Sequence, residues 1–375
     1  MKIIIVGPVY PYRGGLAAFN ERLAKEFATQ GHEVEMFTFC LQYPSFLFPG
    51  KTQYSDGQSP RELSIKREIN SVNPLNWISV ARKIRKKKPD RVVFTYWMSF
   101  VAPCFGTIAR IVKKEKAIQC IGLVHNMIPH EPNIMDKLFP AYFVHSMDAF
   151  VALSRSVRDD ISKYDKKNKP KCFSPHPIYD HYGEMISRET ALAELNLDKT
   201  NKYLLFFGII RDYKGLDLLL KAYSDSRFRT MNLKLIVAGE FYNNASQYFA
   251  LAETLGLKNE IIWHPHFIPD NRVKYYFCAA DIVVQPYKTA TQSGVTQIAY
   301  YYEKPMLVTN VGGLGEIVPD QKVGYVVEPD EKAIADALVD FFTYRNEQSY
   351  ADNLKIEKEK FSWKRMTEAL TNFAK

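Results

Sequence analysis

Short apolar runs alternate along the chain with segments in which apolar residues recur every three or four positions. The first run, at 2–6, ends at Gly7, a helical pattern covers 16–27, and a second run occupies 34–39. Continuous apolar runs are typical of parallel strands that are buried on both faces. This strand–loop–helix–strand opening predicts a right-handed crossover and a doubly wound α/β sheet.

A second series with the same pattern begins near residue 200. Between the two series lies a charged, weakly hydrophobic stretch at 163–171, followed by Pro175 and Pro177. The later strands are expected at 203–207, 233–238, 282–286 and 306–309. The pattern therefore predicts two Rossmann-like domains that face one another across a cleft. Their expected bounds are 1–178 and 179–355, with a helix at 356–375 that returns toward the first domain.

Composition narrows the class of protein. The 375 residues are 46% hydrophobic and 24% charged, which excludes a disordered, collagen-like or coiled-coil chain. The net charge of +9 favours an anionic partner. Because no nucleic-acid-binding module is recognisable, we do not expect that partner to be a nucleic acid. Five scattered cysteines, and the lack of a signal peptide or a long apolar segment, indicate the cytoplasm.

Ligands of open α/β sheets bind beyond the carboxyl ends of the strands, so the loops there are the most informative. Arg211 and Lys214 follow the strand at 203–207 and precede a helix. An arginine fork and a lysine point charge beside a helix N-terminus can clamp a pyrophosphate. Two solvated surface cations are the alternative, but the strand and Gly215 fix their direction and favour the clamp.

Three other loops have suitable chemistry. Residues 289–295 supply hydroxyl groups, a glycine and a helix start, all of which suit phosphate oxygens. Residues 310–316 form a paired-glycine turn with Glu316, a carboxylate that could accept from sugar hydroxyls or cap the next helix. Residues 13–15 place two glycines before the first helix, either for a ligand's approach or for turn geometry alone.

The histidines do not form a metal site by their spacing. His125 follows a strand and His130 lies five residues later, without an HExxH motif. A neutral imidazole could contact a sugar hydroxyl, or these could be loop histidines bonded to the backbone. A GxSxG elbow and a GxxxxGK[ST] loop are also missing, which argues against hydrolase and P-loop functions. The spacing therefore gives no evident metal set, and the family resemblance described next implies that neither a metal nor a cofactor is needed.

The order of short motifs along nearly the whole chain resembles that of the retaining glycosyltransferases of family 4, which have the GT-B fold. Bacterial members that act in surface-polysaccharide or glycolipid assembly are the most similar. The motifs are Gly14-Gly15, Gly31-His32-Glu33-Val34, Arg211 with Lys214, Ile268-Pro269-Asp270, Ala279-Ala280-Asp281, Gln285-Pro286-Tyr287, Lys304-Pro305 and Val311-Gly312-Gly313 with Glu316.

The resemblance implies an acceptor held by the first domain and a nucleotide-sugar donor held by the second. It implies three catalytic residues: Arg211 and Lys214 at the donor diphosphate, and His125 near the transferred sugar. Acceptor contacts are expected from Arg13 and His130. The expected donor-binding residues are Gly14, Gly15, Arg211, Lys214, Ile268, Ser293, Gly294, Val295, Gln297 and Glu316.

One departure from the family pattern concerns a pair of glutamates eight residues apart. Ala290 and Ile298 occupy these positions here, so recognition of the ribose is unassigned, with Gln292 or Gln297 as substitutes. The missing glutamates favour a catalytically lapsed glycan- or nucleotide-binding protein as one alternative. An epimerase or a phosphorylase of the same fold is another.

The expected activity is transfer of a hexose, with retention of configuration, to a glycan or polyprenyl-linked acceptor in surface-polysaccharide or glycoconjugate assembly. A separate hypothesis places the protein against an anionic membrane, at the inner face of the plasma membrane. The basic run at 82–88 follows Trp77 and Ile78, and the loop at 46–48 is apolar. A solvated helix end and a buried loop are the alternative.

Overall fold

The computed structural model describes residues 1–12, 14–43, 54, 60, 62–127, 135–242, 244–290, 293–344 and 347–374. The chain divides into two compact units, which are described separately. Unit 1 comprises Met1–His176 together with Trp363–Lys375, and unit 2 comprises Pro177–Ser362.

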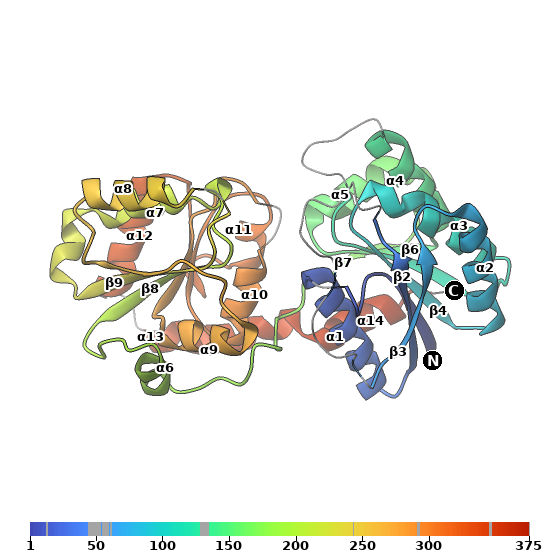
Figure 1. The fold of residues 1–375 in the computed structure, drawn as a ribbon, viewed down its shortest axis with the longest axis horizontal. Helices are drawn as coiled ribbons and strands as arrows, with labels where there is room; N and C mark the ends of the chain where they lie inside the picture. Colours follow the sequence, from blue (N-terminus) through green and yellow to red (C-terminus); the bar gives the residue numbers. More distant parts are fainter. Residues whose placement is uncertain are drawn as a thin grey trace. The chain divides into compact units, whose positions relative to one another are not determined.

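Unit 1 is built on a seven-stranded parallel sheet with the strand order β3-β2-β1-β4-β5-β6-β7 (Figure 1). The strand order reverses between β1 and β4, which is where a doubly wound sheet opens a ligand-binding crevice. The strands are β1 (Lys2–Val6), β2 (Glu33–Leu41), β3 (Ser64–Asn70), β4 (Arg91–Tyr96), β5 (Gln119–Val124), β6 (Ala149–Ala152) and β7 (Lys171–Phe173).

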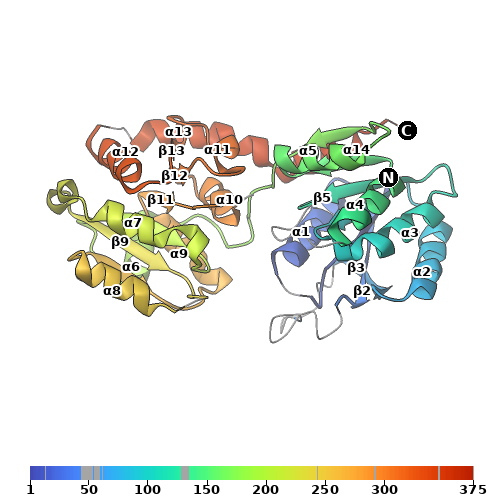
Figure 2. The same ribbon diagram turned by 90° about the horizontal axis from the view of Figure 1, so that it is seen from above.

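Helices cover both faces of this sheet. Because side chains alternate along a strand, Ile3 and Ile5 of β1 pack on one face and Ile4 and Val6 on the other. The first face is covered by α1 (Gly15–Thr29) and α14 (Trp363–Thr371), which lie side by side in Figure 1. The other face carries α2 (Pro74–Lys86), η2 (Ser99–Val101), α3 (Ala102–Val112), α4 (Met135–Ser146) and α5 (Arg155–Tyr164). Figure 2 shows α2 beside α3 and α3 beside α4.

Unit 2 repeats the design with a six-stranded parallel sheet of order β10-β9-β8-β11-β12-β13. The order reverses between β8 and β11. The strands are β8 (Lys202–Phe207), β9 (Leu233–Ala238), β10 (Ile261–His264), β11 (Ile282–Gln285), β12 (Met306–Thr309) and β13 (Gly324–Val327).

Two buried clusters lie on the opposite faces of the second sheet. One contains side chains of α7 (Leu216–Tyr223), α8 (Ser246–Thr254) and α12 (Glu331–Tyr344). The other contains side chains of α6 (Arg188–Glu194), α9 (Asp270–Ala279), α10 (Gly294–Tyr301), α11 (Leu314–Ile317) and α13 (Glu347–Lys358). Short 3-10 turns complete the unit: η3 (Asp212–Lys214), η4 (Ser226–Thr230) and η5 (Glu359–Phe361).

The prediction of two Rossmann-like domains is confirmed, and four predicted strands of unit 2 agree with β8, β9, β11 and β12 to within one residue at either end. The segment expected as a helix at 356–375 comprises the end of α13, η5 and α14. Leu354 and Phe361 are buried in the core of unit 2, so the chain stays in that unit through Ser362. It joins unit 1 from Trp363 onward, where Met366 and Leu370 are buried.

Candidate functional site

The loops after β8, β9 and β11 approach one another at the carboxyl edge of unit 2. The N–H of Gly208 donates to the carbonyl oxygen of Ala238 at 2.9 Å, so the two chains stay paired beyond the strands. A Cβ atom on Gly239 would lie 2.1 Å from the carbonyl oxygen of Gly208, and one on Gly215 would lie 1.9 Å from that of Pro286. Glycine is therefore required at both positions for the loops to pack this closely.

Lys214 is the buried cation of this edge. It ends η3, its side chain is only 9% exposed, and its Nζ lies 5.5 Å from the centre of the Tyr287 ring. Among the described residues no carboxylate or hydrogen-bond acceptor contacts this Nζ. Burial and the nearby Arg211 lower the pKa of Lys214 to about 8. A buried ammonium group without a counter-ion is a strong binding site for an anion.

Arg211 lies three residues before Lys214 and is exposed. Its guanidinium carbon lies 4.0 Å from the centre of the Tyr242 ring, which follows β9. Within the part of the chain that the structure describes, no carboxylate pairs with Arg211. The two cations predicted to form the clamp therefore both lack an acidic partner, but one is buried and the other is held against a ring.

The start of α10 lies beside Lys214. A Cβ atom built on Gly208 would be 3.1 Å from the Nζ of Lys214 and 3.7 Å from a methyl carbon of Val295. Ser293 caps the helix, since its Oγ accepts from the N–H of Val295 at 3.2 Å, and Tyr287 Oη lies 3.2 Å from that Oγ. The positive end of the helix dipole thus adds to the charge of the lysine.

Gly294, the first residue of α10, packs under an aromatic ring from the segment that opens unit 2. A Cβ atom on Gly294 would lie 2.7 Å from Cε2 of Tyr179. The structure therefore places predicted donor residues Ser293, Gly294 and Val295 together with Lys214. Tyr179 and Tyr242 were not predicted, and their only sequence signal is an aromatic residue next to a loop at a strand end.

The glutamine that was predicted to contact the ribose is buried inside α10. Gln297 is 2% exposed, and its Oε1 has no hydrogen-bond partner among the described residues. Ile298, which replaces a family glutamate, is 4% exposed and packs in the core. Gln292 lies outside the described residues, so the structure does not bear on its role.

Two further donor candidates have different surroundings. Ile268 is 6% exposed and belongs to the same buried cluster as Val273, which leaves the main chain of its loop as the surface for a base. The exposed side chain of that loop is Phe267. Glu316 lies exposed in α11, the short helix that follows β12.

In unit 1, the glycines predicted to bind the donor open the long helix α1. Gly14 has a φ of +108°, a conformation that favours glycine, and α1 has no side-chain cap. A Cβ atom on either Gly14 or Gly15 would meet no atom of another described residue within 4 Å. The space over this helix N-terminus is thus open to a ligand.

His125 follows β5 in the same unit. Its ring lies edge-on to Phe19 at 4.7 Å and 6.1 Å from the ring of His176. Burial and the neighbouring His176 hold the pKa of His125 well below its ordinary value, so the ring is neutral at pH 7. Its Nε2 is buried and has no hydrogen-bond partner in the described part of the chain. Arg13 and His130, the predicted acceptor residues, lie outside the described residues.

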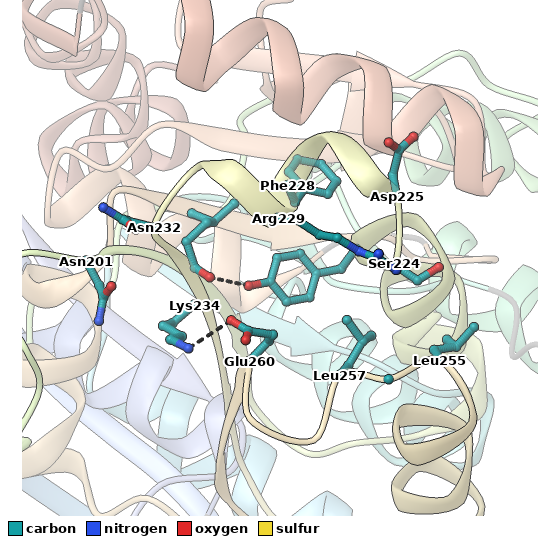
Figure 3. Close-up of a pocket in the computed structure, with 13 residues that line it drawn as sticks. Asn201, Ser224, Asp225, Phe228, Arg229, Asn232, Lys234, Leu255, Leu257 and Glu260 are labelled. Carbon is teal, nitrogen blue, oxygen red and sulfur yellow. Dashed lines mark hydrogen bonds and ion pairs between the residues drawn. The ribbon is translucent and has the colours of Figure 1, made fainter.

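A pocket of about 420 Å³ lies at the opposite, amino-terminal edge of the sheet of unit 2 (Figure 3). Leu257 and Phe228 line it, and Lys234 pairs with Glu260 at 2.8 Å. Because α7 and α8 end at this pocket, their dipoles place negative partial charge there, which disfavours a diphosphate. None of the residues that the sequence predicts to bind the donor lines this pocket.

Two features are absent from the described residues. No group of three or more His, Cys, Asp and Glu side chains there is arranged to hold a metal ion. No described helix is both long enough and apolar enough to cross a bilayer.

Each unit is a Rossmann-like α/β domain, and the second has a buried cation next to its strand-order reversal. Residues 13–174 match the family described as Glycosyltransferase Family 4, and residues 187–358 match Glycosyl transferases group 1. A D-inositol 3-phosphate glycosyltransferase of Segniliparus rotundus is 31% identical over 336 residues, which cover 84% of this chain and 73% of that protein. The chain therefore belongs to glycosyltransferase family 4.

More distant proteins are similar over their full length. An uncharacterized glycosyltransferase of Methanocaldococcus jannaschii is 21% identical over 97% of this chain and 95% of its own. A sucrose-phosphate synthase of Thermosynechococcus elongatus has a TM-score of 0.72 at 17% identity, covering 99% of this chain and 97% of that one. HepE of Anabaena, solved with UDP and glucose, has a TM-score of 0.68 at 14% identity over all of both chains. At these identities the solved structures show the fold alone.

Proposed function

We propose that this protein is a retaining glycosyltransferase that transfers a hexose from a nucleoside-diphosphate sugar to a glycan or polyprenyl-linked acceptor. Its place would be surface-polysaccharide or glycoconjugate assembly at the cytoplasmic side of the membrane. The observation that carries the proposal is the buried ammonium of Lys214, which has no acidic partner among the described residues and lies beside the start of α10.

In the proposed reaction, the bond between the anomeric carbon and the diphosphate oxygen breaks, and negative charge develops on the leaving nucleotide. Arg211, Lys214 and the α10 N-terminus stabilise that charge because they are already oriented before it forms. The acceptor oxygen bonds to the anomeric carbon on the same face, and its proton passes to the departing phosphate. These fixed cations are the reason that we propose transfer without a metal ion.

His125 would contact a hydroxyl of the transferred sugar. A neutral imidazole carries one N–H donor and one acceptor nitrogen, and the buried Nε2 is without a hydrogen-bond partner among the described residues. A sugar hydroxyl can donate to the acceptor nitrogen of the ring or accept from its N–H group. We therefore assign His125 to orientation of the sugar and not to proton transfer from the acceptor.

The donor is best identified by the stability of the folded protein, since a ligand that binds only the folded state raises the melting temperature. UDP-, GDP- and ADP-sugars should be compared on the wild type and on Lys214→Ala, with and without EDTA. We expect one nucleotide series to stabilise the wild type but not the variant, equally in EDTA. No stabilisation by any of the three series would contradict the proposal.

Transfer itself requires an acceptor. The relative named as an inositol phosphate glycosyltransferase suggests adding a phosphorylated polyol to polyprenyl-linked and free glycans in the screen. NMR of the product should show the anomeric configuration of the donor. Epimerised donor without transfer would favour the epimerase alternative, and nucleotide binding without any turnover would favour the lapsed binding protein.

We also propose peripheral contact with an anionic membrane, through the end of α2 and not through Trp77. Trp77, the aromatic anchor that the sequence suggests, is partly buried against the core, and its Nε1 donates to the carbonyl oxygen of Asn70 at 2.7 Å. Lys83 and Lys87 are paired with glutamates. The remaining exposed cations of the run are Arg82, Lys86 and Lys88. The loop at 46–48 lies outside the described residues.

Flotation with vesicles that contain anionic lipid tests this contact. Reversal of Arg82, Lys86 and Lys88 to Glu should abolish flotation. The matched control reverses three exposed lysines of unit 2, Lys199, Lys258 and Lys332, and should float like the wild type. Equal flotation of both triple variants would remove the proposed membrane face.

A further inference from the structure

Tyr242 lies beyond the carboxyl end of β9 and is the aromatic residue over which the Arg211 guanidinium lies, at 4.0 Å from the ring centre. Its side chain is 64% exposed. An exposed tyrosine is not needed to fill the core, so its contact with Arg211 calls for another explanation. We propose that Tyr242 is a positioning residue that holds Arg211 in the orientation required to bind the donor diphosphate. This inference rests on the proposed function of Arg211.

The fold fixes the two residues to the same short stretch of paired backbone. The N–H of Ile210 donates to the carbonyl oxygen of Glu240 at 2.8 Å, and the N–H of Tyr242 donates to the carbonyl oxygen of Ile210 at 3.0 Å. Ile210 and Phe241 form a parallel bridge past the ends of β8 and β9. Arg211 and Tyr242 are therefore the next residues after the bridged pair, one on each of the two neighbouring chain segments.

The bridge is itself anchored by packing. Ile210 is only 1% exposed, and the ring of Phe241 lies 5.6 Å from that of Tyr248 and 6.3 Å from that of Trp263. The main chain on both sides of the Arg211–Tyr242 contact is thus held by buried neighbours. The ring of Tyr242 is presented to Arg211 by a rigid part of the fold.

A guanidinium over a ring face keeps its in-plane N–H groups available. Those N–H groups form the fork that binds two phosphate oxygens, whereas the flat face of the group is satisfied by the ring quadrupole. No carboxylate among the described residues competes for this fork. An acidic partner would have to be displaced before a diphosphate could bind, but an aromatic ring does not.

The two cations are consequently held by different means. Lys214 is fixed by burial, and its position does not depend on Tyr242. Arg211 is exposed, and in the described part of the chain its guanidinium lies against the ring of Tyr242. Loss of the ring should therefore weaken the contribution of Arg211 to binding and leave that of Lys214 in place.

The test measures the dissociation constant of UDP by calorimetry, together with kcat and KM for the donor found in the screen. The variants are Tyr242→Ala, Tyr242→Phe, Arg211→Ala and the double variant Arg211→Ala with Tyr242→Ala. We expect Tyr242→Ala to weaken UDP binding about two- to fivefold, the range of an exposed cation–π contact. Tyr242→Phe keeps the ring and should behave like the wild type.

The double variant separates positioning from direct contact. If Tyr242 acts through Arg211, its removal has no further effect once Arg211 is alanine. Additional weakening in the double variant would mean that the ring touches the nucleotide itself and would overturn the inference. So would a Tyr242→Phe variant that is as weak as Tyr242→Ala.

The outcomes also separate this inference from the proposed function. Unchanged UDP binding in Arg211→Ala would overturn the role of Arg211 and with it the proposed clamp. Weakened binding in Arg211→Ala with unchanged binding in Tyr242→Ala would overturn only the positioning role. Tyr344→Ala removes another exposed tyrosine, 78% exposed at the end of α12, and serves as the matched control.

Discussion

Lys214 shows how a single residue can be unfavourable for folding and favourable for binding. Its ammonium group is buried with no acidic partner among the described residues, and it would gain a counter-ion only when a phosphate binds. Stability is commonly sacrificed in this way at functional sites. Two consequences can be measured on this residue alone.

The first is the pH dependence of donor binding. Burial lowers the pKa of Lys214 to about 8, and the protonated form binds the diphosphate. Affinity for UDP should therefore fall as the pH rises through about 8, and binding should take up protons there. Calorimetry above about pH 7.5, where the phosphates of UDP are already ionised, measures both effects.

Lys214→Arg is the control for this pH dependence, because arginine stays charged across the range. The variant should show a flat affinity profile between about pH 7.5 and 9.5, the range in which wild-type affinity declines. A flat profile in the wild type would show that Lys214 does not hold the phosphates.

The second consequence concerns the free energy of unfolding. The pKa of Lys214 is lower in the folded than in the unfolded state, so below about pH 8 the folded state bears the full penalty of the buried charge. The penalty disappears as the pH rises toward 10.5, where the unfolded lysine also loses its proton. Lys214→Met should therefore stabilise the protein at pH 7 by up to about 3 kcal/mol. Urea unfolding measures this, and a variant less stable than the wild type would contradict it.

At the scale of elements, the important features are two helices that begin at the carboxyl edges of the sheets. α1 and α10 both start at glycine, but for different reasons. The space around Gly15 is open, whereas Gly294 lies against Tyr179. Substitution by alanine should therefore have opposite effects on stability at the two positions.

Gly15→Ala should leave the fold intact. Alanine favours a helix over glycine by up to about 1 kcal/mol, and its methyl group would meet no other described residue within 4 Å. If a donor phosphate approaches this helix, transfer should fall at least about tenfold with an unchanged or higher melting temperature. Transfer at the wild-type rate would remove Gly15 from the donor site.

Gly294→Ala should destabilise the protein in spite of the helix propensity of alanine. The new methyl group would lie 2.7 Å from the Tyr179 ring, which must then move. A double-mutant cycle with Tyr179→Ala should show that Gly294→Ala is less harmful once the ring is gone. Additive effects on the free energy of unfolding would contradict the contact.

At the scale of the whole molecule, the chain leaves unit 1 after His176 and returns to it at Trp363. The returning segment completes the core of unit 1, since Trp363, Met366 and Leu370 are all at most 4% exposed. Unit 1 is consequently assembled from both ends of the chain. Its stability depends on a segment that the sequence places after the whole of unit 2.

Truncation after Ser362 tests this dependence. Loss of three buried side chains should destabilise unit 1 by more than about 5 kcal/mol, whereas the core of unit 2 contains none of them. Hydrogen exchange should show lost protection in α1 and retained protection in β8. Equal protection of α1 in both proteins would show that unit 1 does not require α14.

Several features of the structure could not be predicted from the sequence, and each omission has a physical reason. β3 is an edge strand of mostly half-exposed and polar residues, so it lacks the continuous apolar run of a buried strand. The break between α13 and α14 was missed because helical periodicity continues on either side of it. Trp77 was interpreted as a membrane anchor because sequence cannot show that its indole N–H is bonded to Asn70.

The alternation of apolar runs and helical patterns was sufficient to determine two doubly wound domains. This pattern is local, because a continuous apolar run indicates a buried strand and a spacing of three or four residues indicates a helix. It also determined that Arg211, Lys214 and Ser293 follow strands, and hence lie at the binding edge. Only the tertiary structure decided that Lys214 is buried without an acidic partner in the described part of the chain, that Tyr242 supports Arg211, and that residues 363–371 complete unit 1. Each of these depends on contacts between residues that belong to different elements, and such contacts leave no periodic pattern in the sequence.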